Sequence, residues 1–338
     1  MPLFEDISLT EKDFFRAVVL YGRNVASYKF ALAESLIGLG SDGNDFVSLE
    51  ELAIPFSEAI CRHLQTQDKQ TTARSSTFLD TLRSFNSGQI GAAEKIEATV
   101  RRGFINVIDA FHVVGPRDIP LRFFHDERNA SNPGIRLTDE LFMMTKDLES
   151  EDLLKENESR WRLVETAWGY NIPKRLITVD YDPKLELFFA IDSRERRHNV
   201  TNAAPALNGY QRGKCFYCKR QINLGSSVLL EERPEVDHFF PHVLQRNPDV
   251  DVDLDQAWNL VLACNKCNRE KSARCPHVSH VEDLHKRNEY LIQSHHPLRG
   301  SIIARTGKAE VDRRGFLQDV RNSAKLSLVH TWTTPAVI

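Results

Sequence analysis

Four of the six cysteines in this sequence form two C-x-x-C pairs, Cys215 with Cys218 and Cys264 with Cys267. Two thiolate pairs supply the four soft ligands that a tetrahedral structural zinc ion requires. A redox role is disfavoured, because neither pair follows a strand in a βαβ context. We therefore interpret the four cysteines as Zn²⁺ ligands, and we expect the ion to tie together the two ends of the segment between the pairs.

The segment between the cysteine pairs places an acid and a histidine side by side, Asp237 and His238. Alternate side chains of an extended segment point to opposite faces, so Glu235 and Asp237 should share one face and His238 the other. The stretch "WNLVLACNKCNREKS" indicates a short strand, the second cysteine pair and a helix that opens near Asn268. The predicted order is strand, loop, strand and helix, a ββα unit held by zinc.

The motifs "CFYC", "VDHFFP" and "WNLVLACNKCNREKS", in this order, make residues 215–276 similar to the HNH endonucleases with a ββα-metal fold. The stretch "SYKFALAESL" more weakly resembles the N-terminal region of HNH proteins from bacterial defence and restriction systems. The resemblance implies a hydrolase that cuts phosphodiester bonds in DNA, with double-stranded DNA favoured over single-stranded DNA. It also implies a catalytic Mg²⁺ or Mn²⁺ ion and a role in antiviral defence.

The same resemblance implies a role for each residue of the motif. His238 would be the general base, since a neutral imidazole with a pKa near 6.5 accepts a proton from water near neutral pH. Asp237 and Asn268 would be oxygen ligands of the catalytic cation. Asn259 would hold the loop that orients His238. Lys271 would reach the scissile phosphate as a point charge.

Other residues of this segment suggest alternative sites. Glu235 is a secondary candidate for the same cation as Asp237. His242 suggests a two-histidine metal site, but Pro241 should break the helical spacing that such a site needs. The acidic run at 249–255 lacks the glycine and the glutamate of a calcium loop. We interpret it as a solvated loop that points away from nucleic acid.

Nucleic acid is then expected on the opposite side, where basic residues flank the cysteine pairs. These are Arg212, Lys214, Lys219, Arg220, Lys266 and Arg274. Two other functions stay open at this point. One is a zinc-stabilised module that binds nucleic acid without turnover, and the other is an RNase, because the same site would serve either sugar.

The sequence before the cysteine pairs shows mainly helical patterns. Ser48 and Glu51 form a predicted capping box, and Pro55 is expected to kink the helix that follows. Apolar runs at 175–181 and 185–191 predict a β-hairpin, and the polar stretch 192–209 suggests a linker. Over the whole chain, apolar residues recur at helical spacing in 22–40, 78–85, 150–168, 279–294 and 312–328.

We therefore predict an α+β protein with two domains. A mostly helical domain at 1–195 would serve recognition, assembly or regulation, through a protein partner or as a homo-oligomer. An HNH nuclease domain at 196–338, with its core at 212–277, would carry the chemistry and end in helices. The net charge of −3 and the 41% hydrophobic content are those of a globular protein. The sequence contains neither an apolar run of about 20 residues nor a signal peptide pattern, so we expect a cytoplasmic protein without a membrane span.

Overall fold

The structure, a computed structural model, divides into two compact units, Met1–Gly169 and Tyr170–Ile338. It describes residues 9–21, 25–146, 150–169, 179–191, 197–225, 233–246, 250, 252–293, 298–328 and 330–334. The boundary expected near residue 195 lies outside the described residues. The units divide earlier in the chain, so the predicted hairpin groups with the second unit rather than the first.

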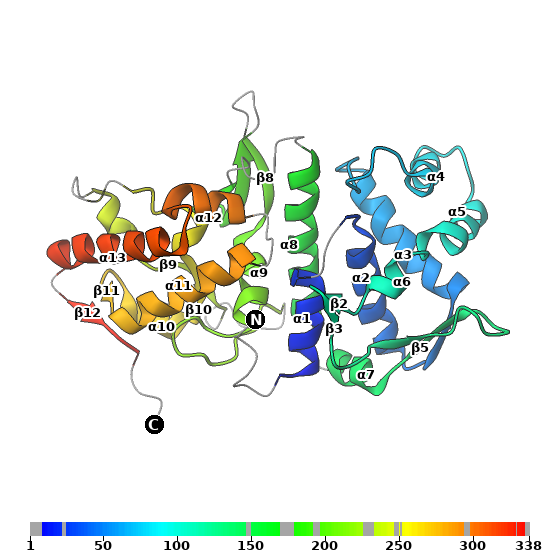
Figure 1. Cartoon of the computed structure of the whole chain (residues 1–338), viewed down its shortest axis with the longest axis horizontal. Coiled ribbons are helices and arrows are strands. Elements are labelled where there is room, and N and C mark those ends of the chain that lie inside the picture. The colour runs from blue at the N-terminus through cyan, green and yellow to red at the C-terminus, as the bar shows by residue number, and fades with distance from the viewer. Residues whose placement is uncertain are drawn as a thin grey trace. The chain divides into compact units, whose positions relative to one another are not determined.

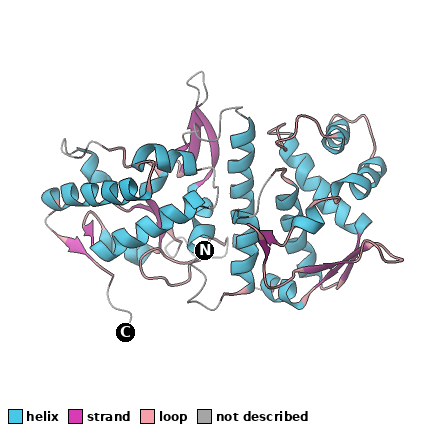
Figure 2. Ribbon diagram, in the orientation of Figure 1, coloured by secondary structure: helices cyan, strands magenta, loops and turns pink. Residues whose placement is uncertain are grey.

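Helices make up most of the first unit (Figures 1 and 2). They are α1 (Glu11–Tyr21), α2 (Tyr28–Asp42), α3 (Leu49–Leu64), α4 (Thr77–Asn86), α5 (Ala92–Ala98), the π-helical turn η1 (Thr99–Gly103), α6 (Val107–Ala110), α7 (Asp139–Thr145) and α8 (Ser150–Gly169). Its strands are short: β1 (Phe46–Ser48), β2 (Val113–Val114), β3 (Arg117–Asp118), β4 (Phe124–Asp126) and β5 (Gly134–Leu137). β1, β5 and β4 form one antiparallel sheet in that order, and β2 pairs with β3.

Helix α3 begins at the predicted capping box. Ser48 Oγ accepts a hydrogen bond from the Glu51 amide at 3.2 Å, and the Glu51 carboxylate accepts one from the Ser48 amide at 2.8 Å. The helix continues through Pro55 to Leu64. Its buried face includes Leu52 and Phe56, which are four residues apart and therefore lie on one side of the helix.

Helix α2 is the centre of the first unit, where it packs against α3, α7 and α8. Phe30 on α2 is fully buried and stacks on Trp161 of α8, with ring centroids 5.9 Å apart. The stretch 27–36, which resembles defence-type HNH proteins, forms most of this helix and lies largely in the core. Apolar side chains buried in a core report on packing, so this likeness concerns the fold rather than a site.

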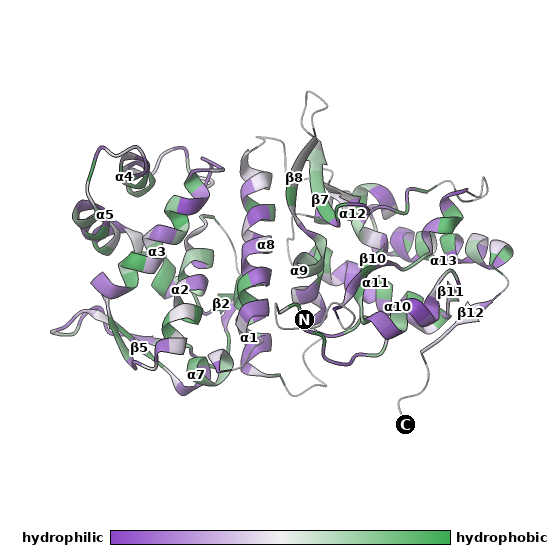
Figure 3. Ribbon diagram, turned by 180° about the vertical axis from the view of Figure 1, so that it is seen from behind, coloured by the Kyte–Doolittle hydropathy of each residue, from purple (hydrophilic) through white to green (hydrophobic). Residues whose placement is uncertain are grey.

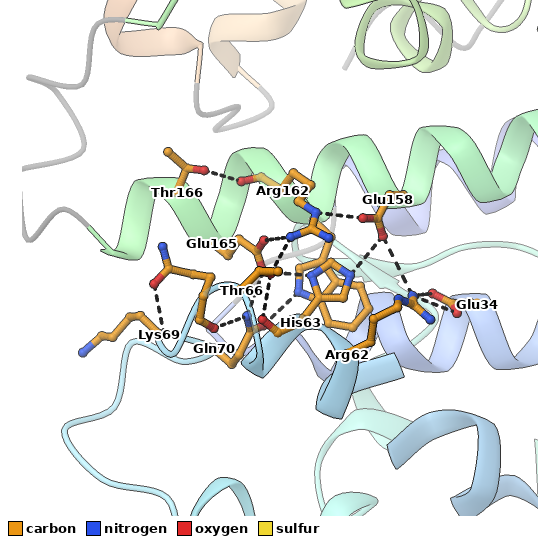
Figure 4. Close-up of polar contacts among 12 residues, drawn as sticks. Glu34, Arg62, His63, Thr66, Lys69, Gln70, Glu158, Arg162, Glu165 and Thr166 are labelled. Carbon is orange, nitrogen blue, oxygen red and sulfur yellow. Dashed lines mark hydrogen bonds and ion pairs between the residues drawn. The ribbon is translucent and has the colours of Figure 1, made fainter. Parts of the chain in front are cut away.

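A buried polar cluster joins α3 to α8 (Figure 4). His63 is 0% exposed, and its Nδ1 and Nε2 atoms lie 2.9 Å from carboxylate oxygens of Glu165 and Glu158, respectively. The imidazole ring stacks on Trp161 with a centroid distance of 3.5 Å. Because a carboxylate accepts hydrogen bonds, both ring nitrogens must donate, and His63 is held as an imidazolium cation.

The second unit combines small sheets with helices. Its helices are α9 (Ala203–Asn208), α10 (Asn265–Lys271), α11 (Val278–Gln293), α12 (Arg299–Thr306) and α13 (Glu310–Ser327), with the 3₁₀ turns η2 (Gly209–Gln211), η3 (His242–Arg246) and η4 (Ala257–Asn259). Its strands are β6 (Val179–Asp182), β7 (Leu187–Ile191), β8 (Arg197–Asn202), β9 (Glu235–His238), β10 (Leu260–Ala263), β11 (Cys275–Pro276) and β12 (Thr331–Trp332). β6, β7 and β8 form an antiparallel sheet, β9 pairs antiparallel with β10, and β11 pairs parallel with β12.

The fold class is α+β, as predicted, and the expected hairpin is present as β6 and β7. The linker suggested at 192–209 is wrong over its described part, because residues 197–208 form β8 and α9. β8 is a strand because its backbone forms hydrogen bonds with β7. Its polar sequence lacks the apolar alternation that would have predicted a strand there.

Helices α11 and α13 confirm the helical patterns at 279–294 and 312–328, and both pack against α12. The hydropathy of the second unit is uneven at the ββα unit, where α10 is hydrophilic and β10 is hydrophobic (Figure 3). Within the described residues, none of the helices combines the length and apolarity needed to cross a membrane.

Candidate functional site

Four sulfur atoms converge beside the start of α10. The Sγ atoms of Cys215, Cys218, Cys264 and Cys267 all lie within 4.8 Å of one another, and those of Cys218 and Cys264 are 3.8 Å apart. A tetrahedral ion with Zn–S bonds of about 2.3 Å requires S···S edges of about 3.8 Å. Over the part of the chain that the structure describes, no other group of His, Cys, Asp or Glu side chains converges in this way.

The ionisation of these cysteines favours a bound cation. The hydrogen bond from Cys267 lowers the pKa of Cys215 to about 5, while burial and the neighbouring Cys215 raise the pKa of Cys264 to about 11. The pKa of Cys267 is also raised, mainly by its hydrogen bond to Cys215. One thiolate therefore makes the next harder to form, and a central cation removes this repulsion.

The ββα unit follows in the predicted order. β9 pairs antiparallel with β10, with His238 opposite Leu260 and Glu235 opposite Ala263. α10 begins at Asn265, earlier than the expected start near Asn268, because Cys264 is its N-cap residue. Cys267 thus lies in the first turn of α10, so the cysteine cluster fixes the start of the helix against the end of β10.

His238 lies at the end of β9 and is 15% exposed. Its Nε2 atom is 2.6 Å from Oδ1 of Asp255, and Nε2 of His242 is 3.4 Å from the other oxygen of the same carboxylate. The two imidazole rings meet edge to face with centroids 5.3 Å apart. One carboxylate therefore lies between two histidines at the end of the strand.

Residues 215–277 match a family model described as "HNH endonuclease". They form an HNH domain. The matched segment holds both cysteine pairs, β9, β10 and α10, so the match and the geometry identify the same unit. Searches of curated proteins and of solved structures found no match to the chain. The match to this family model supports nuclease activity and nucleic-acid binding by residues 215–277.

Asp237 points to the interior of the HNH domain, where it binds Lys271 of α10. Lys271 Nζ lies 2.9 Å from each carboxylate oxygen of Asp237 and donates a further bond to the His238 carbonyl. The Tyr217 hydroxyl donates a third bond to Asp237 at 2.6 Å. Burial raises the pKa of Asp237 and lowers the pKa of Lys271, and the ion pair opposes both shifts.

This geometry corrects the role expected for Lys271. Its side chain is 1% exposed, and its ammonium group is already bonded to Asp237 and to the backbone of His238. A side chain in this position cannot extend to a phosphate outside the domain. Lys271 instead fixes the strand that carries His238 against α10. Helical spacing from Asn268 does not indicate whether a lysine faces solvent or the strand.

Asn268, the other expected cation ligand, lies with Glu235 rather than with Asp237. Its Nδ2 atom donates to Glu235 Oε2 at 2.5 Å, and Nδ2 of Asn265 donates to Glu235 Oε1 at 2.9 Å. All three side chains are partly exposed. Glu235, which the sequence suggested only as a secondary candidate, therefore lies with the predicted ligand Asn268. Asp237, the other predicted ligand, is separated from them because it pairs with Lys271.

Asn259 takes the loop-holding contacts expected from the resemblance. It is fully buried; its Oδ1 accepts from the Phe240 amide at 2.8 Å, and its Nδ2 donates to the carbonyls of Phe240 and Leu254, each at 3.0 Å. These bonds join the chain just after His238 to the turn that precedes Asp255. Asn259 thus fixes both members of the His238–Asp255 contact.

The sequence did not predict that α11 supports the turn η4, which contains Asn259. Arg287 and Asn288 on α11 are buried, and they donate hydrogen bonds to the carbonyls of Ala257 and Trp258 in η4. Asn259 is the next residue of the same turn. The sequence gives one signal for these positions. Residues 287 and 288 are a charged and an amide residue on the buried face of an otherwise amphipathic helix.

The acidic loop also differs from its prediction. Residues 249 and 251 of the run lie outside the described residues, but Asp255 turns inward to His238 instead of facing solvent. His242 lies beside His238 despite Pro241, because the 3₁₀ turn η3 begins at His242. Among the described residues, however, the two histidines belong to no metal-competent cluster.

Proposed function

We propose that this protein is a metal-dependent HNH endonuclease that hydrolyses phosphodiester bonds in DNA. The observation that carries the proposal is the partly exposed imidazole of His238, held by a carboxylate at the end of β9 inside the matched HNH domain. A module that only binds nucleic acid does not need a histidine oriented in this way. The proposal includes a structural Zn²⁺ ion at the four cysteines.

His238 is the general base of the proposed reaction. Burial lowers its pKa below the usual histidine value, against the opposing effect of Asp255, so the ring is neutral at neutral pH. A neutral imidazole takes a proton from the attacking water as the water oxygen bonds to phosphorus; the P–O bond to the leaving oxygen then breaks, and that oxygen takes a proton from solvent. The buried bonds of Asn259 keep the ring at the strand end while this proton moves.

The donor set on the other strand face fits a hard cation. Glu235 offers a carboxylate, and Asn265 and Asn268 offer amide oxygens once their side chains rotate. Bound there, Mg²⁺ or Mn²⁺ would stabilise charge on the phosphate and on the leaving oxygen. We assign this role to Glu235 and Asn268, and we assign Asp237, with Lys271, to holding the strand in place.

Two isosteric variants test this assignment. Glu235→Gln should leave stability nearly unchanged and abolish cation binding, measured by calorimetric titration of the zinc-loaded protein with Mn²⁺. Asp237→Asn should instead destabilise the second unit, because Lys271 then stays buried without its carboxylate. Loss of Mn²⁺ binding in Asp237→Asn, with Glu235→Gln unaffected, would return the ligand role to Asp237.

The activity test uses supercoiled plasmid and labelled RNA, each incubated with Mg²⁺ or Mn²⁺ and the wild-type chain or His238→Ala. We expect the wild type to nick or linearise the plasmid and the variant to leave it intact. Cutting of RNA alone would make the protein an RNase. Binding of either nucleic acid without any cutting by the wild type would show a binding module.

We further propose that the first unit serves recognition, assembly or control, through a protein partner or a second copy of the chain, and that the whole protein acts in bacterial defence in the cytoplasm. The proposal on defence is supported by the motif resemblance of the chain. Survival of cells that express wild type or His238→Ala during phage infection tests it, and equal survival of the two would argue against it.

A further inference from the structure

The first unit contains a cavity of about 390 Å³ between α6, β3 and β4. Its inner lining is apolar and aromatic, and consists of Ile108, His112 and Phe124, each at most 3% exposed. Its outer lining is exposed and polar, and consists of Asp109, Asp118, Arg122, His125 and Asp126. An apolar interior with a few polar groups is the usual form of a small-molecule site in proteins.

His112 presents a hydrogen-bond donor to this cavity. Its Nε2 atom accepts a hydrogen bond from the Phe123 amide at 3.0 Å, so the proton of the neutral ring is on Nδ1. Burial lowers the pKa of His112 to about 3, which keeps the ring neutral. Within the described residues Nδ1 has no hydrogen-bond partner, and it does not belong to the fully buried polar atoms that lack one. A donor that is neither bonded nor fully buried, on a ring that lines the cavity, is open to that cavity.

Three phenylalanines fix the direction of this donor. The His112 ring stacks on Phe123 with centroids 6.0 Å apart, and it tilts against Phe124 at 4.7 Å. Phe111 meets the same ring edge to face at 5.3 Å. A ring that is packed against three others and bonded at Nε2 keeps its orientation. Nδ1 is therefore in place before a ligand arrives, which lowers the entropy cost of binding.

The outer lining offers carboxylate oxygens as acceptors. Asp118 bonds to Arg122 through Oδ2, and Asp109 bonds to Arg128 through Oδ1. Among the described contacts the second oxygen of each carboxylate has no partner, and a carboxylate accepts up to about four hydrogen bonds. The charge of Asp118 opposes the fall in the pKa of His112, so this acid lies close to the ring. With three aspartates and one arginine, the lining is negative overall.

These groups disfavour most classes of ligand. A metal ion needs a lone pair, but the lone pair of His112 is used at Nε2, and the described residues of the cavity form no group of metal ligands. An ammonium or guanidinium group has no acceptor for the Nδ1 proton. A phosphate accepts hydrogen bonds but meets the negative charge of the lining. An uncharged planar ring with both an acceptor and an N–H donor fits, and nucleobases are such rings.

We propose that the cavity between α6, β3 and β4 binds a nucleobase. An acceptor atom of the base receives the hydrogen bond from His112 Nδ1, and a neighbouring N–H of the base donates to Asp118. The ring of the base packs on Phe124 and Ile108, as bases do on aromatic side chains. The negative lining favours a free nucleoside as the source of the base, because a strand brings phosphates. The inference does not depend on cleavage by the HNH domain, and it gives the first unit a ligand of its own.

Calorimetric titration measures the binding. The zinc-loaded full chain is titrated, without Mg²⁺, with adenosine, cytidine, guanosine and uridine in turn. We expect at least one nucleoside to bind with a Kd below about 1 mM, and its 5′-monophosphate to bind more weakly. Asp118→Ala should weaken the binding of that nucleoside by about 10-fold or more, the effect of one lost hydrogen bond to a charged group. The matched control is Asp68→Ala, an exposed acid of the same unit that also pairs with an arginine, and it should bind like the wild type.

His112→Asn tests the donor and should abolish the binding. Because the Phe123 amide then loses its acceptor, folding of the first unit is checked by circular dichroism. If this variant unfolds, saturation-transfer NMR with the wild type replaces it. The base protons of the nucleoside should then receive more saturation than the ribose protons, since the base lies on Phe124, and Asp118→Ala should lose the effect. Greater saturation of the ribose would contradict the inference.

The remaining outcomes are equally distinct. No heat of binding with any of the four nucleosides, equal binding in Asp118→Ala, or tighter binding of the monophosphate would each overturn the inference. Mn²⁺ that binds to the wild type and not to Asp118→Ala would do the same, because the cavity would then be a metal site. A short single strand that binds more tightly than the nucleoside, and loses this in Asp118→Ala, would support the site with a strand as the source of the base.

The proposed function and this inference can fail separately. A protein that cuts DNA but binds no nucleoside keeps the proposed function and loses the inference. A protein that binds a nucleoside through Asp118 but cuts no nucleic acid keeps the inference and loses the proposed function.

Discussion

His63 in the first unit and His238 in the second both bond to acidic side chains, but they differ in burial and in the number of acids. His63 is 0% exposed, stacks on Trp161 and has a carboxylate on each ring nitrogen. His238 is partly exposed and has Asp255 on Nε2. Burial disfavours the charged form of both rings, yet only in His63 do two carboxylates outweigh it.

The pKa values of the two histidines therefore shift in opposite directions. Burial alone would lower the pKa of His63, but the hydrogen bonds to Glu158 and Glu165 raise it above the usual value. Burial lowers the pKa of His238, and one carboxylate does not reverse this. A histidine held as a cation links two helices, whereas a neutral histidine can accept a proton. The same pairing of residue types thus serves stability in one unit and, as we propose, chemistry in the other.

The largest expected effect comes from removing the four-cysteine zinc site of the second unit. The described residues of the first unit contain no such group of metal ligands. Cys264→Ser should lose zinc and unfold the second unit, because structural zinc contributes about 10 kcal/mol to such folds. The first unit should keep its own thermal transition. Elemental analysis and calorimetry measure the two effects. Cys275→Ser, a buried cysteine outside the cluster, is the matched control and should keep one zinc per chain.

The next largest effect is expected from replacing His238, the proposed general base. His238→Ala should lower the rate of plasmid cleavage by about 10²- to 10⁴-fold, the usual contribution of a general base. Its unfolding transition should stay close to that of the wild type, since the ring is partly exposed. A wild-type rate in this variant would show that the two histidines do not differ in the way we describe.

His63→Gln should lower stability and leave catalysis unchanged, the reverse of what we expect for His238→Ala. It removes the charged hydrogen bonds of His63 to Glu158 and Glu165, while Arg162 still pairs with both carboxylates, so we expect the first unit to lose about 2 kcal/mol of stability. Denaturant titration measures this loss. The kcat of the folded fraction should not change. Arg62→Ala removes an exposed member of the same cluster and should cost at most about 1 kcal/mol.

The smallest expected effect is a pH dependence confined to the first unit. A histidine whose folded pKa is raised stabilises the fold fully below its unfolded pKa of about 6.5, and this contribution is lost as pH rises through the folded value. The stability difference between wild type and His63→Gln should therefore shrink above about pH 6.5. Denaturant titrations of both proteins between pH 6 and pH 9, at about one-unit steps, test this. A difference that grows with pH would contradict the imidazolium assignment.

The acid side of this profile follows from Glu158. Burial alone would raise its pKa, but the hydrogen bond and charge of His63, together with Arg162, lower it to about 2. A carboxylate with a lowered pKa stabilises the fold above its unfolded pKa, and this stabilisation disappears as pH falls toward about 2. His63 and Glu158 together place the greatest contribution of the cluster in mildly acidic solution.

Short-range spacing predicted much of the second unit. The two C-x-x-C pairs indicated a four-sulfur site, and alternation in "EVDH" separated Glu235 and Asp237 from His238. The capping box at Ser48 and the long helices of both units were also predicted. These features depend on the backbone geometry of a few neighbouring residues, which a sequence carries directly.

The sequence by itself determined which residue types reach the site: four thiols, one histidine beside an acid, and two asparagines at the family's spacing. Tertiary structure alone decided their partners. It buried Lys271 against Asp237, joined Asn268 to Glu235 and turned Asp255 to His238. These contacts join residues that are 34, 33 and 17 positions apart. Local periodicity holds no information at that range, because which polar groups meet depends on how the strands, the loop and α10 pack to satisfy buried charge.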